Sequence, residues 1–247
     1  MGLLTFSINV TLDGCVDHQE GIADDETHAF FTRLMDEGGA MLWGRVTYEM
    51  MESYWPAVAR GDEEAPPAMR EWAVKLEAKP KYVVSSTRKD FPWTNSHHIA
   101  GDLHTGIQKL KDATPDGVLL GSGKLATELD RLDLIDEYKI LVHPRIAGHG
   151  PTLYQSGLPS TRRLELASAT PLRNGAVAVA RPSRAAPSAL GFLHHGRQVV
   201  VGVRGLAVRA EDDPAPDDRQ QGHHQRDLVD SSASQHVRHH SQVQRPE

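Results

Sequence analysis

Hydrophobic and polar residues alternate at the start of the chain and then change to a helical spacing. Apolar side chains occupy every second position of residues 4–10, with threonine, serine and asparagine between them. This period is typical of a β-strand. A polar loop follows, and Asp24 and Asp25 precede an apolar stripe that begins at Phe30. The pattern predicts a helix that begins near Asp24 and ends at Gly38.

Short apolar runs that end in polar or glycine-containing turns recur along the following part of the chain. They predict buried strands over residues 40–43, 81–86, 99–101, 118–120 and 138–142. Helices are predicted between them, one from Gly44 through Trp55 and others over residues 69–76, 102–110 and 123–132. Residues 56–67 are predicted to form a charged, proline-containing loop. Two final runs, 164–169 and 176–180, flank an Asn-Gly turn and predict an antiparallel pair.

This alternation of strands and helices predicts an α/β fold. The expected sheet is mainly parallel, with helices on both faces and an antiparallel edge at the carboxyl-terminal end. In such a sheet, ligands bind at the carboxyl ends of the strands. Polar loops lie at Gly44, Ser85 and Gly121, each at the carboxyl end of a predicted strand. We therefore expect these three loops to meet at one edge of the sheet.

The stretch from Asp116 to Leu132 carries the strongest chemical signal. A buried strand is followed by Gly121-Ser122-Gly123 and then by a helix, with Ser122 placed to cap the first turn. A helix start beside a bare glycine turn directs unpaired N–H groups and the positive end of the helix dipole toward one point, which suits a phosphate. A plain strand-to-helix connection explains the same residues without a ligand. The stretch matches neither a P-loop nor a Rossmann fingerprint.

Composition narrows the class of protein. The chain has 247 residues, a formal net charge of −6 and a single cysteine, Cys15. The mildly negative charge gives no basis for binding nucleic acid or a membrane surface, and no apolar run reaches membrane-spanning length. One cysteine excludes internal disulfides and cysteine-rich zinc sites, and no metal site is expected. We expect a soluble, cytoplasmic protein.

The composition changes at about Pro182. Apolar residues become sparse apart from residues 199–208, while arginine, histidine, glutamine, proline and aspartate dominate. We expect residues 182–247 to be a low-complexity, disordered tail. Its histidines are predicted to be solvated rather than metal-ligating. The sequence does not distinguish a native tail from a frame-shifted extension.

Six motifs along the first part of the chain occur together, in order, at a consistent spacing. They are Thr11-Leu12-Asp13-Gly14, Trp43-Gly44-Arg45-Val46-Thr47-Tyr48-Glu49, Tyr82-Val83-Val84-Ser85-Ser86-Thr87, Gly121-Ser122-Gly123-Lys124-Leu125, Leu134-Ile135-Asp136-Glu137-Tyr138 and Pro144-Arg145-Ile146-Ala147-Gly148-His149-Gly150. With these motifs, the chain resembles the dihydrofolate-reductase-like family that includes the reductase domain of bacterial riboflavin biosynthesis, the RibD C-terminal type. Two features depart from the family pattern. His149 stands where a small residue is usual, and the final strand ends in Arg181-Pro182 rather than in an aromatic residue.

The resemblance implies a dihydrofolate-reductase-like three-layer sandwich over residues 1–181, a homodimer, and NADPH bound across the carboxyl edge of the sheet. It implies that the pyrophosphate meets two helix starts, at Gly44, Arg45 and Thr47 and at Gly121, Ser122, Gly123, Lys124 and Leu125. The adenosine ribose and its 2′-phosphate would lie by Ser85, Ser86, Thr87 and Arg88. Val10 and Thr11 would approach the nicotinamide, with Asp13 beside the substrate as the candidate catalytic residue.

Several of these residues have a structural alternative. Arg45 can pair with a carboxylate of its own helix, and Asp13 can act only as the first residue of an Asp-Gly turn. His143 is predicted to be a hydrogen-bonded core histidine. Trp43, Trp55 and Trp93 are predicted to belong to the core rather than to a stacking platform. No motif near Cys15 marks it as a nucleophile.

The first functional hypothesis is an NADPH-dependent reductase of a small pterin- or pyrimidine-like heterocycle. Its leading specific activity is that of the 5-amino-6-(5-phosphoribosylamino)uracil reductase of riboflavin biosynthesis. The zinc deaminase of the same pathway cannot be built from one cysteine. Dihydrofolate reductase is the enzymatic alternative, and a non-catalytic nucleotide-binding protein on the same fold is the alternative from another class. The sequence fixes neither the substrate nor the oligomeric state.

Overall fold

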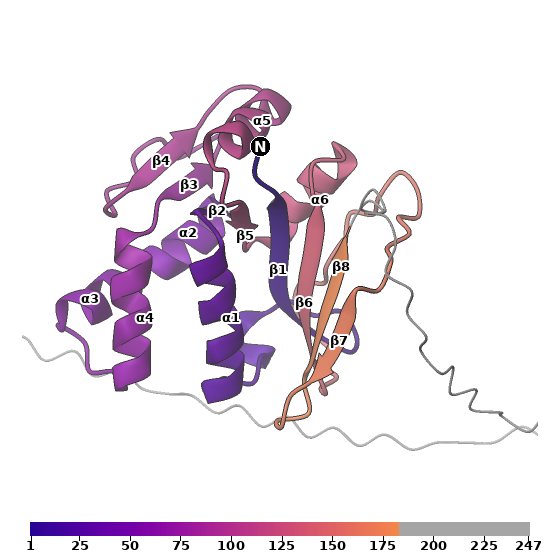
Figure 1. Cartoon of the computed structure of the whole chain (residues 1–247), viewed down its shortest axis with the longest axis horizontal. Helices are drawn as coiled ribbons and strands as arrows, with labels where there is room; N and C mark the ends of the chain where they lie inside the picture. The colour runs from indigo at the N-terminus through magenta and orange to yellow at the C-terminus, as the bar shows by residue number, and fades with distance from the viewer. Residues whose placement is uncertain (183–247) are drawn as a thin grey trace, which may run out of the picture. The chain divides into compact units, whose positions relative to one another are not determined.

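The computed structural model describes residues 1–182, which form one sheet with helices on both of its faces (Figure 1). The strands of this sheet are β1 (Leu4–Thr11), β2 (Ala40–Gly44), β3 (Lys81–Val84), β4 (Ser96–Ile99), β5 (Val118–Leu120), β6 (Glu137–His143), β7 (Ser168–Pro171) and β8 (Val177–Pro182). The helices are η1 (His18–Glu20), α1 (Asp25–Glu37), α2 (Arg45–Glu52), α3 (Trp55–Arg60), α4 (Pro67–Ala78), α5 (Leu103–Ala113) and α6 (Gly123–Arg131).

The strands lie in the order β4-β3-β2-β5-β1-β6-β8-β7. Every pair from β4 to β6 is parallel, and β8 pairs antiparallel with both β6 and β7. The predicted α/β fold, with its mainly parallel sheet and antiparallel carboxyl-terminal strands, is therefore confirmed. The central strand β1 lies between β5 and β6, and the fully buried strand β5 lies between β1 and β2.

Two hydrophobic cores cover the two faces, because neighbouring residues of each strand point to opposite sides. On one face, Leu4, Phe6 and Leu120 pack against apolar residues of α5 and α6. On the other face, Met41, Trp43 and other strand residues pack against α1, α2 and α4. Figure 1 shows α1 and α4 side by side on that face. Within the described residues, no helix is long and apolar enough to cross a bilayer.

Local signals placed α1 correctly. Asp24 lies at the N-cap, and its side chain accepts the N–H of Thr27, while Gly38 follows the last helical residue and donates its N–H to the carbonyl of Leu34. The same two positions ended the helix in the sequence-based prediction. A polar cap and a glycine stop are local features, which is why the sequence revealed them.

The prediction for residues 44–67 was wrong in two respects. The predicted helix through Trp55 is two helices, because α2 ends at Glu52 and α3 begins at Trp55. Part of the predicted loop is therefore helical. Pro56 is the second residue of α3, a position where the missing N–H costs no hydrogen bond, and Gly61 ends the helix with a φ of 82°. Proline marked a helix start here rather than a loop.

Two strand predictions were displaced along the chain. The strand expected at residues 99–101 is β4, Ser96–Ile99, which ends before Gly101 with its φ of +83°. Its Ser-His-His-Ile sequence gives almost no apolar signal. The strand expected at residues 164–169 is β7, Ser168–Pro171, and its side chains are exposed at the sheet edge. An edge strand with no buried side chain carries no alternating pattern.

The domain boundary expected at residue 181 stays a prediction, and Pro182 still belongs to β8. The expected disordered tail, together with its histidines, lies outside the described residues.

Candidate functional site

The carboxyl ends of four neighbouring strands bring most of the predicted site residues to one edge of the sheet. β3, β2, β5 and β1 are consecutive in the sheet and parallel. β2 ends at Gly44, and the carboxyl ends of β3, β5 and β1 lead directly into Ser85, Gly121 and Leu12 respectively. The last residues of β1, Val10 and Thr11, pair with β6 beyond the end of β5. The expectation that the three polar loops share an edge agrees with this topology.

Ser122 joins the two helix starts at this edge. Its hydroxyl accepts the N–H of Gly44 at 3.0 Å and donates to Oγ1 of Thr47 at 2.7 Å. The predicted capping role was wrong: Ser122 occupies the N-cap position of α6 without a side-chain cap bond. Its buried hydroxyl instead fixes the start of α2 against the start of α6. The first N–H groups of both helices lack intrahelical partners and are held at a fixed separation.

The glycines of these loops differ in whether the surrounding side chains leave space for a Cβ atom. A Cβ on Gly44 would lie 3.8 Å from Leu125, and one on Gly123 would lie 3.5 Å from Ile8, both ordinary contacts. Neither residue has a positive φ. A Cβ on Gly121 would lie 3.1 Å from the indole nitrogen of Trp43. Packing therefore explains Gly121, whereas neither a close contact nor a positive φ requires a glycine at residues 44 and 123.

Arg45 pairs with a carboxylate of its own helix, the structural alternative to phosphate binding. Its Nη1 lies 2.7 Å from Glu49 one turn later on α2, and both side chains are partly exposed. An exposed i,i+4 pair contributes about 0.3–0.5 kcal/mol, which leaves Arg45 free to exchange partners. Lys124, on the first turn of α6, is exposed. These two residues are the cations next to the paired helix starts.

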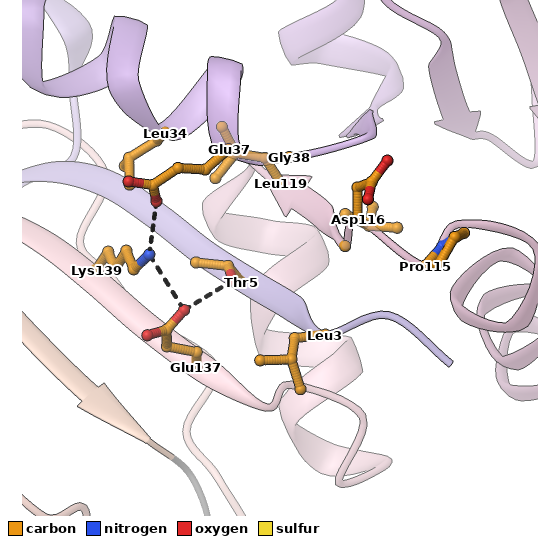
Figure 2. A pocket seen from close by; sticks show the side chains of 12 residues that line it. Leu3, Thr5, Leu34, Glu37, Gly38, Pro115, Asp116, Leu119, Glu137 and Lys139 are labelled. Atoms are coloured by element: carbon orange, nitrogen blue, oxygen red, sulfur yellow. Dashed lines mark hydrogen bonds and ion pairs between the residues drawn. The ribbon is translucent and has the colours of Figure 1, made fainter.

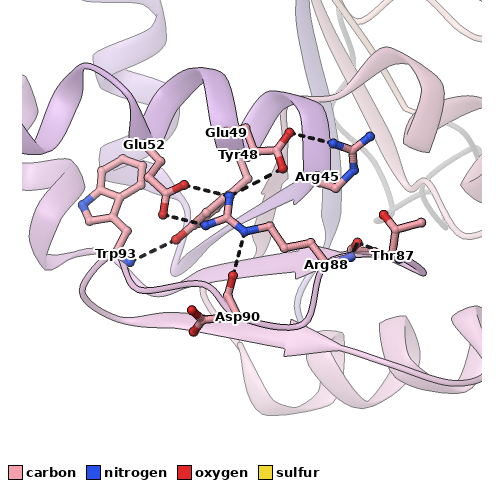
Figure 3. Close-up of polar contacts among 9 residues, drawn as sticks. Arg45, Tyr48, Glu49, Glu52, Thr87, Arg88, Asp90 and Trp93 are labelled. Atoms are coloured by element: carbon pink, nitrogen blue, oxygen red, sulfur yellow. Dashed lines mark hydrogen bonds and ion pairs between the residues drawn. The ribbon is translucent and has the colours of Figure 1, made fainter.

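The loop after β3 is built on Ser85. Its hydroxyl accepts the N–H groups of Thr87 at 3.2 Å and Arg88 at 2.9 Å, and its carbonyl lies 2.9 Å from Nε2 of His98. Ser86 and Thr87 are exposed. Arg88 does not point freely into solvent, because its guanidinium is bound to Glu52 on α2 (Figure 3). Glu52 lies 36 residues earlier in the chain, and no local pattern could have identified it.

Asp13 ties two loops together. Its carboxylate accepts the hydroxyl of Thr11 at 2.5 Å and the N–H groups of Ala147 at 3.1 Å and Gly148 at 2.7 Å. The hydrogen bond from Thr11 and those from the two backbone groups lower the pKa of Asp13 from 3.8 to about 2. The ionised carboxylate is thus an acceptor at neutral pH and a poor proton donor. This geometry favours the turn-stabilising alternative over proton delivery.

A charge change at this position has a predictable effect on stability. A carboxylate whose pKa is lowered on folding stabilises the native state above its ordinary pKa and loses that contribution as the pH falls through its native pKa. We expect Asp13→Asn to lower the melting temperature at neutral pH, and the difference from wild type to shrink between about pH 4 and pH 2. Thermal melts across this range test it. A pH-independent difference would show that the charge of Asp13 does not matter.

The bend that Asp13 contacts continues into a wall beside α6. Residues 14–16 pair with residues 151–153: the N–H of Val16 donates to the carbonyl of Pro151 at 2.9 Å, and that of Leu153 to Gly14 at 3.0 Å. Cys15 forms an antiparallel bridge with Thr152 and is 1% exposed, which agrees with the absence of a nucleophile motif. Leu153 and Val16 would both contact a Cβ on Gly123. The wall thus closes one side of the candidate site.

The residues predicted to belong to the core mostly do. His143 is fully buried, with Nε2 2.8 Å from Oδ1 of Asn9 and Nδ1 accepting the N–H of Ile22 at 3.2 Å. Burial lowers the pKa of His143, with a smaller contribution from Arg145. Trp43 and Trp93 are buried and stacked, with ring centroids 5.9 Å apart. Trp55 is only half-buried and packs on Trp72.

One hollow lies near this edge of the sheet, and another lies far from it. One of about 390 Å³ lies at the end of β4 and the start of α5, lined by His98, Asp102, Lys109 and their neighbours, and His98 connects it to Ser85. The other, of about 220 Å³, lies at the opposite edge, beside the first residues of β1, β5 and β6 (Figure 2). There Lys139 lies 3.1 Å from Glu37 and 3.4 Å from Glu137, so the polar groups satisfy one another. Only the first hollow adjoins the candidate site.

The sheet order and the two joined helix starts define an α/β protein with the dihydrofolate-reductase-like arrangement. Comparison with known proteins identifies the particular family. Residues 3–178 match the RibD C-terminal domain family, and the chain belongs to that family. The matched range contains every residue of the candidate site.

Individual proteins resemble this chain in fold or in sequence. A putative riboflavin biosynthesis protein from Shewanella sp. PV-4 has a similar structure, with a TM-score of 0.56 and 20% identity over 73% of this chain and 98% of its own. A diaminohydroxyphosphoribosylaminopyrimidine deaminase/5-amino-6-(5-phosphoribosylamino)uracil reductase from Thermotoga maritima has a TM-score of 0.52 and 17% identity, over 73% of this chain and 56% of its own. At these identities the likeness concerns the fold. The uncharacterized protein YyaP of Bacillus subtilis (strain 168) is 26% identical over 155 residues, 61% of this chain and 79% of its own.

Proposed function

We propose that this RibD C-terminal-type domain is an NADPH-dependent reductase of a small pterin- or pyrimidine-like heterocycle. The observation that carries the proposal is the pair of helix starts joined by Ser122, where Gly44 and Gly123 carry no side chain although neither packing nor φ requires a glycine. Two sets of unpaired N–H groups at a fixed separation suit the two phosphates of a dinucleotide. Family membership supports the cofactor, because reductases of this family typically use NADPH.

Different residues at this edge of the sheet would bind different parts of the cofactor. The N–H groups of the first turns of α2 and α6, with Arg45, Thr47, Lys124 and Leu125, would hold the pyrophosphate. The loop of Ser85, Ser86, Thr87 and Arg88 would lie by the adenosine ribose, next to the hollow of about 390 Å³. Val10 and Thr11 would border the nicotinamide. When bound, the cofactor supplies a hydride, and the chain supplies orientation and exclusion of water.

Asp13 would serve as an acceptor for the substrate. Its carboxylate uses three bonds to hold Thr11, Ala147 and Gly148. A carboxylate has about four acceptor positions, so one remains for an N–H of a pyrimidine or pterin edge. With its pKa at about 2, Asp13 orients the substrate and donates no proton near neutral pH. Asp13→Asn should therefore raise KM more than it lowers kcat, with no new pH dependence between about pH 5 and pH 9.

The reductase of riboflavin biosynthesis is the leading specific activity, and a homodimer is the expected assembly. The test is to titrate the purified protein with NADPH and then to follow the loss of NADPH absorbance with candidate pyrimidines, pterins and flavins. Turnover of the phosphoribosylamino-uracil substrate supports the specific proposal, and turnover of dihydrofolate alone would favour the alternative enzyme. Binding without turnover of any substrate would favour a non-catalytic nucleotide-binding protein.

A further inference from the structure

The guanidinium of Arg88 is already fully engaged by protein groups. Its Nη1 lies 2.8 Å and its Nη2 3.1 Å from the two carboxylate oxygens of Glu52, a bidentate arrangement. Nη1 also lies 3.5 Å from Glu49, and Nε donates to the carbonyl of Asp90 at 2.7 Å. Figure 3 shows these contacts converging on the guanidinium from α2 and from the loop after β3. Every nitrogen of the group has a partner.

Aromatic packing strengthens this arrangement. The guanidinium carbon lies 5.2 Å from the ring centroid of Tyr48 and 5.3 Å from that of Phe91. The side chains of Arg88 and Glu52 are 25% and 21% exposed, so water screens their attraction only in part. A bidentate carboxylate pair on aromatic rings is among the stronger sites for an arginine. Glu52 is the first cause of the raised pKa of Arg88.

The surrounding patch carries balanced charge. Arg45 pairs with Glu49 at 2.7 Å, so two arginines face two carboxylates of the same helix. A ribose 2′-phosphate would bring about two negative charges to this patch. It would have to draw Arg88 away from Glu52 and would then lie close to an unpaired carboxylate. The uncharged 2′-hydroxyl of NADH meets neither obstacle.

We propose that Glu52 limits the preference for NADPH over NADH by competing with the 2′-phosphate for Arg88. This inference rests on the proposed function, because it requires that the adenosine ribose lies by the loop of Ser85 to Arg88. Glu52 is a specificity-determining residue and touches neither the nicotinamide nor the substrate. NADH should bind almost as well as NADPH, and removal of the Glu52 charge should release Arg88 to the phosphate.

Binding measurements on the ligand-free protein test this without any turnover. Calorimetry would compare 2′,5′-ADP with 5′-AMP, which differ only in the 2′-phosphate, and NADPH with NADH. In Glu52→Gln, the amide keeps a hydrogen bond to Arg88 and removes the charge. We expect 2′,5′-ADP and NADPH to bind about tenfold more tightly to this variant, with 5′-AMP and NADH unchanged within about twofold.

Two further variants separate this effect from its alternatives. Glu71→Gln on α4 removes an equal charge from a side chain that is 72% exposed and lies 3.6 Å from Lys75. Glu71→Gln should leave the affinity for all four ligands unchanged. An equal gain in affinity for 2′,5′-ADP and NADPH in this variant would show that the effect of Glu52→Gln comes from net charge alone. Arg88→Ala combined with Glu52→Gln should abolish the gain. Melting curves of each variant identify any loss of folding.

The outcomes are distinguishable. A wild-type protein that prefers NADPH strongly, and whose preference Glu52→Gln does not increase, overturns the inference while the proposed function stands. A gain that survives the loss of Arg88 overturns it as well. Absence of binding by all four ligands removes the proposed function and this inference together.

Discussion

Replacing Gly123 with valine is expected to weaken NADPH binding by at least about tenfold, on the order of 1.4 kcal/mol. Gly123 is the first residue of α6, and the N–H groups that follow it have no intrahelical partners. A branched side chain at this position stands between these donors and any phosphate. Isothermal titration of wild type and variant with NADPH measures the effect directly.

The structure provides matched controls for this experiment. A Cβ on Gly123 meets Ile8, Leu153 and Val16 at 3.5–3.7 Å, so Gly123→Ala should fold with an unchanged melting temperature and still bind less tightly. Gly121→Ala places a Cβ 3.1 Å from the Trp43 indole and should lower the melting temperature instead. If both alanine variants lose stability and affinity in parallel, the glycines serve the fold, and the phosphate site is wrong.

The features that the sequence revealed are those fixed by neighbours in the chain. The alternating apolar positions of β1 and the polar start of α1 are local, and the structure contains both. The meeting of Gly44, Ser85 and Gly121 at one edge also followed from the sequence, because parallel strands with crossover helices align their carboxyl ends. The topology required no knowledge of individual side-chain contacts.

The features that the sequence did not reveal depend on partners far along the chain. Ser122 resembles a helix cap in sequence, but its hydroxyl instead accepts the N–H of Gly44, 78 residues earlier in the chain. Arg88 resembles a free phosphate ligand until α2 packs against its loop and supplies Glu52. Strand β4 lacks an apolar pattern because two of its four residues are histidines. At Ser122 tertiary packing overrides a correct local propensity, whereas β4 offers no local pattern to override.

Asp130 on α6 is the centre of a buried polar network that no local sequence pattern indicates. Its carboxylate accepts the hydroxyls of Tyr138 and Tyr154, each at 2.5 Å, and lies 2.7 Å from Nε of Arg162. The side chain of Asp130 is 1% exposed. Burial and the neighbouring carboxylate raise the pKa of both tyrosines, so both phenols stay protonated and keep donating. The network attaches strand β6 and the segment around Tyr154 to α6.

Asp130→Ala is therefore expected to lower the free energy of unfolding by about 3–5 kcal/mol, the usual cost of removing one partner of a buried ion pair. The variant leaves two phenols and part of a guanidinium without an acceptor in the interior. Denaturant unfolding of residues 1–247 measures the loss. Because Leu153 lies beside both Tyr154 and Gly123, NADPH binding should weaken as well, although Asp130 does not touch the candidate site.

Asp133→Asn is the matched control, because Asp133 lies 2.7 Å from Nη1 of the same Arg162 but is 52% exposed, and asparagine tolerates its φ of 55°. An exposed ion pair contributes about 0–1 kcal/mol, so this variant should remain close to wild type. Tyr154→Phe removes a single donor from Asp130 and should give an intermediate loss of about 1–3 kcal/mol. Equal losses for Asp130→Ala and Asp133→Asn would contradict the assignment, because they would locate the stabilisation at Arg162 and the surface rather than at the buried carboxylate.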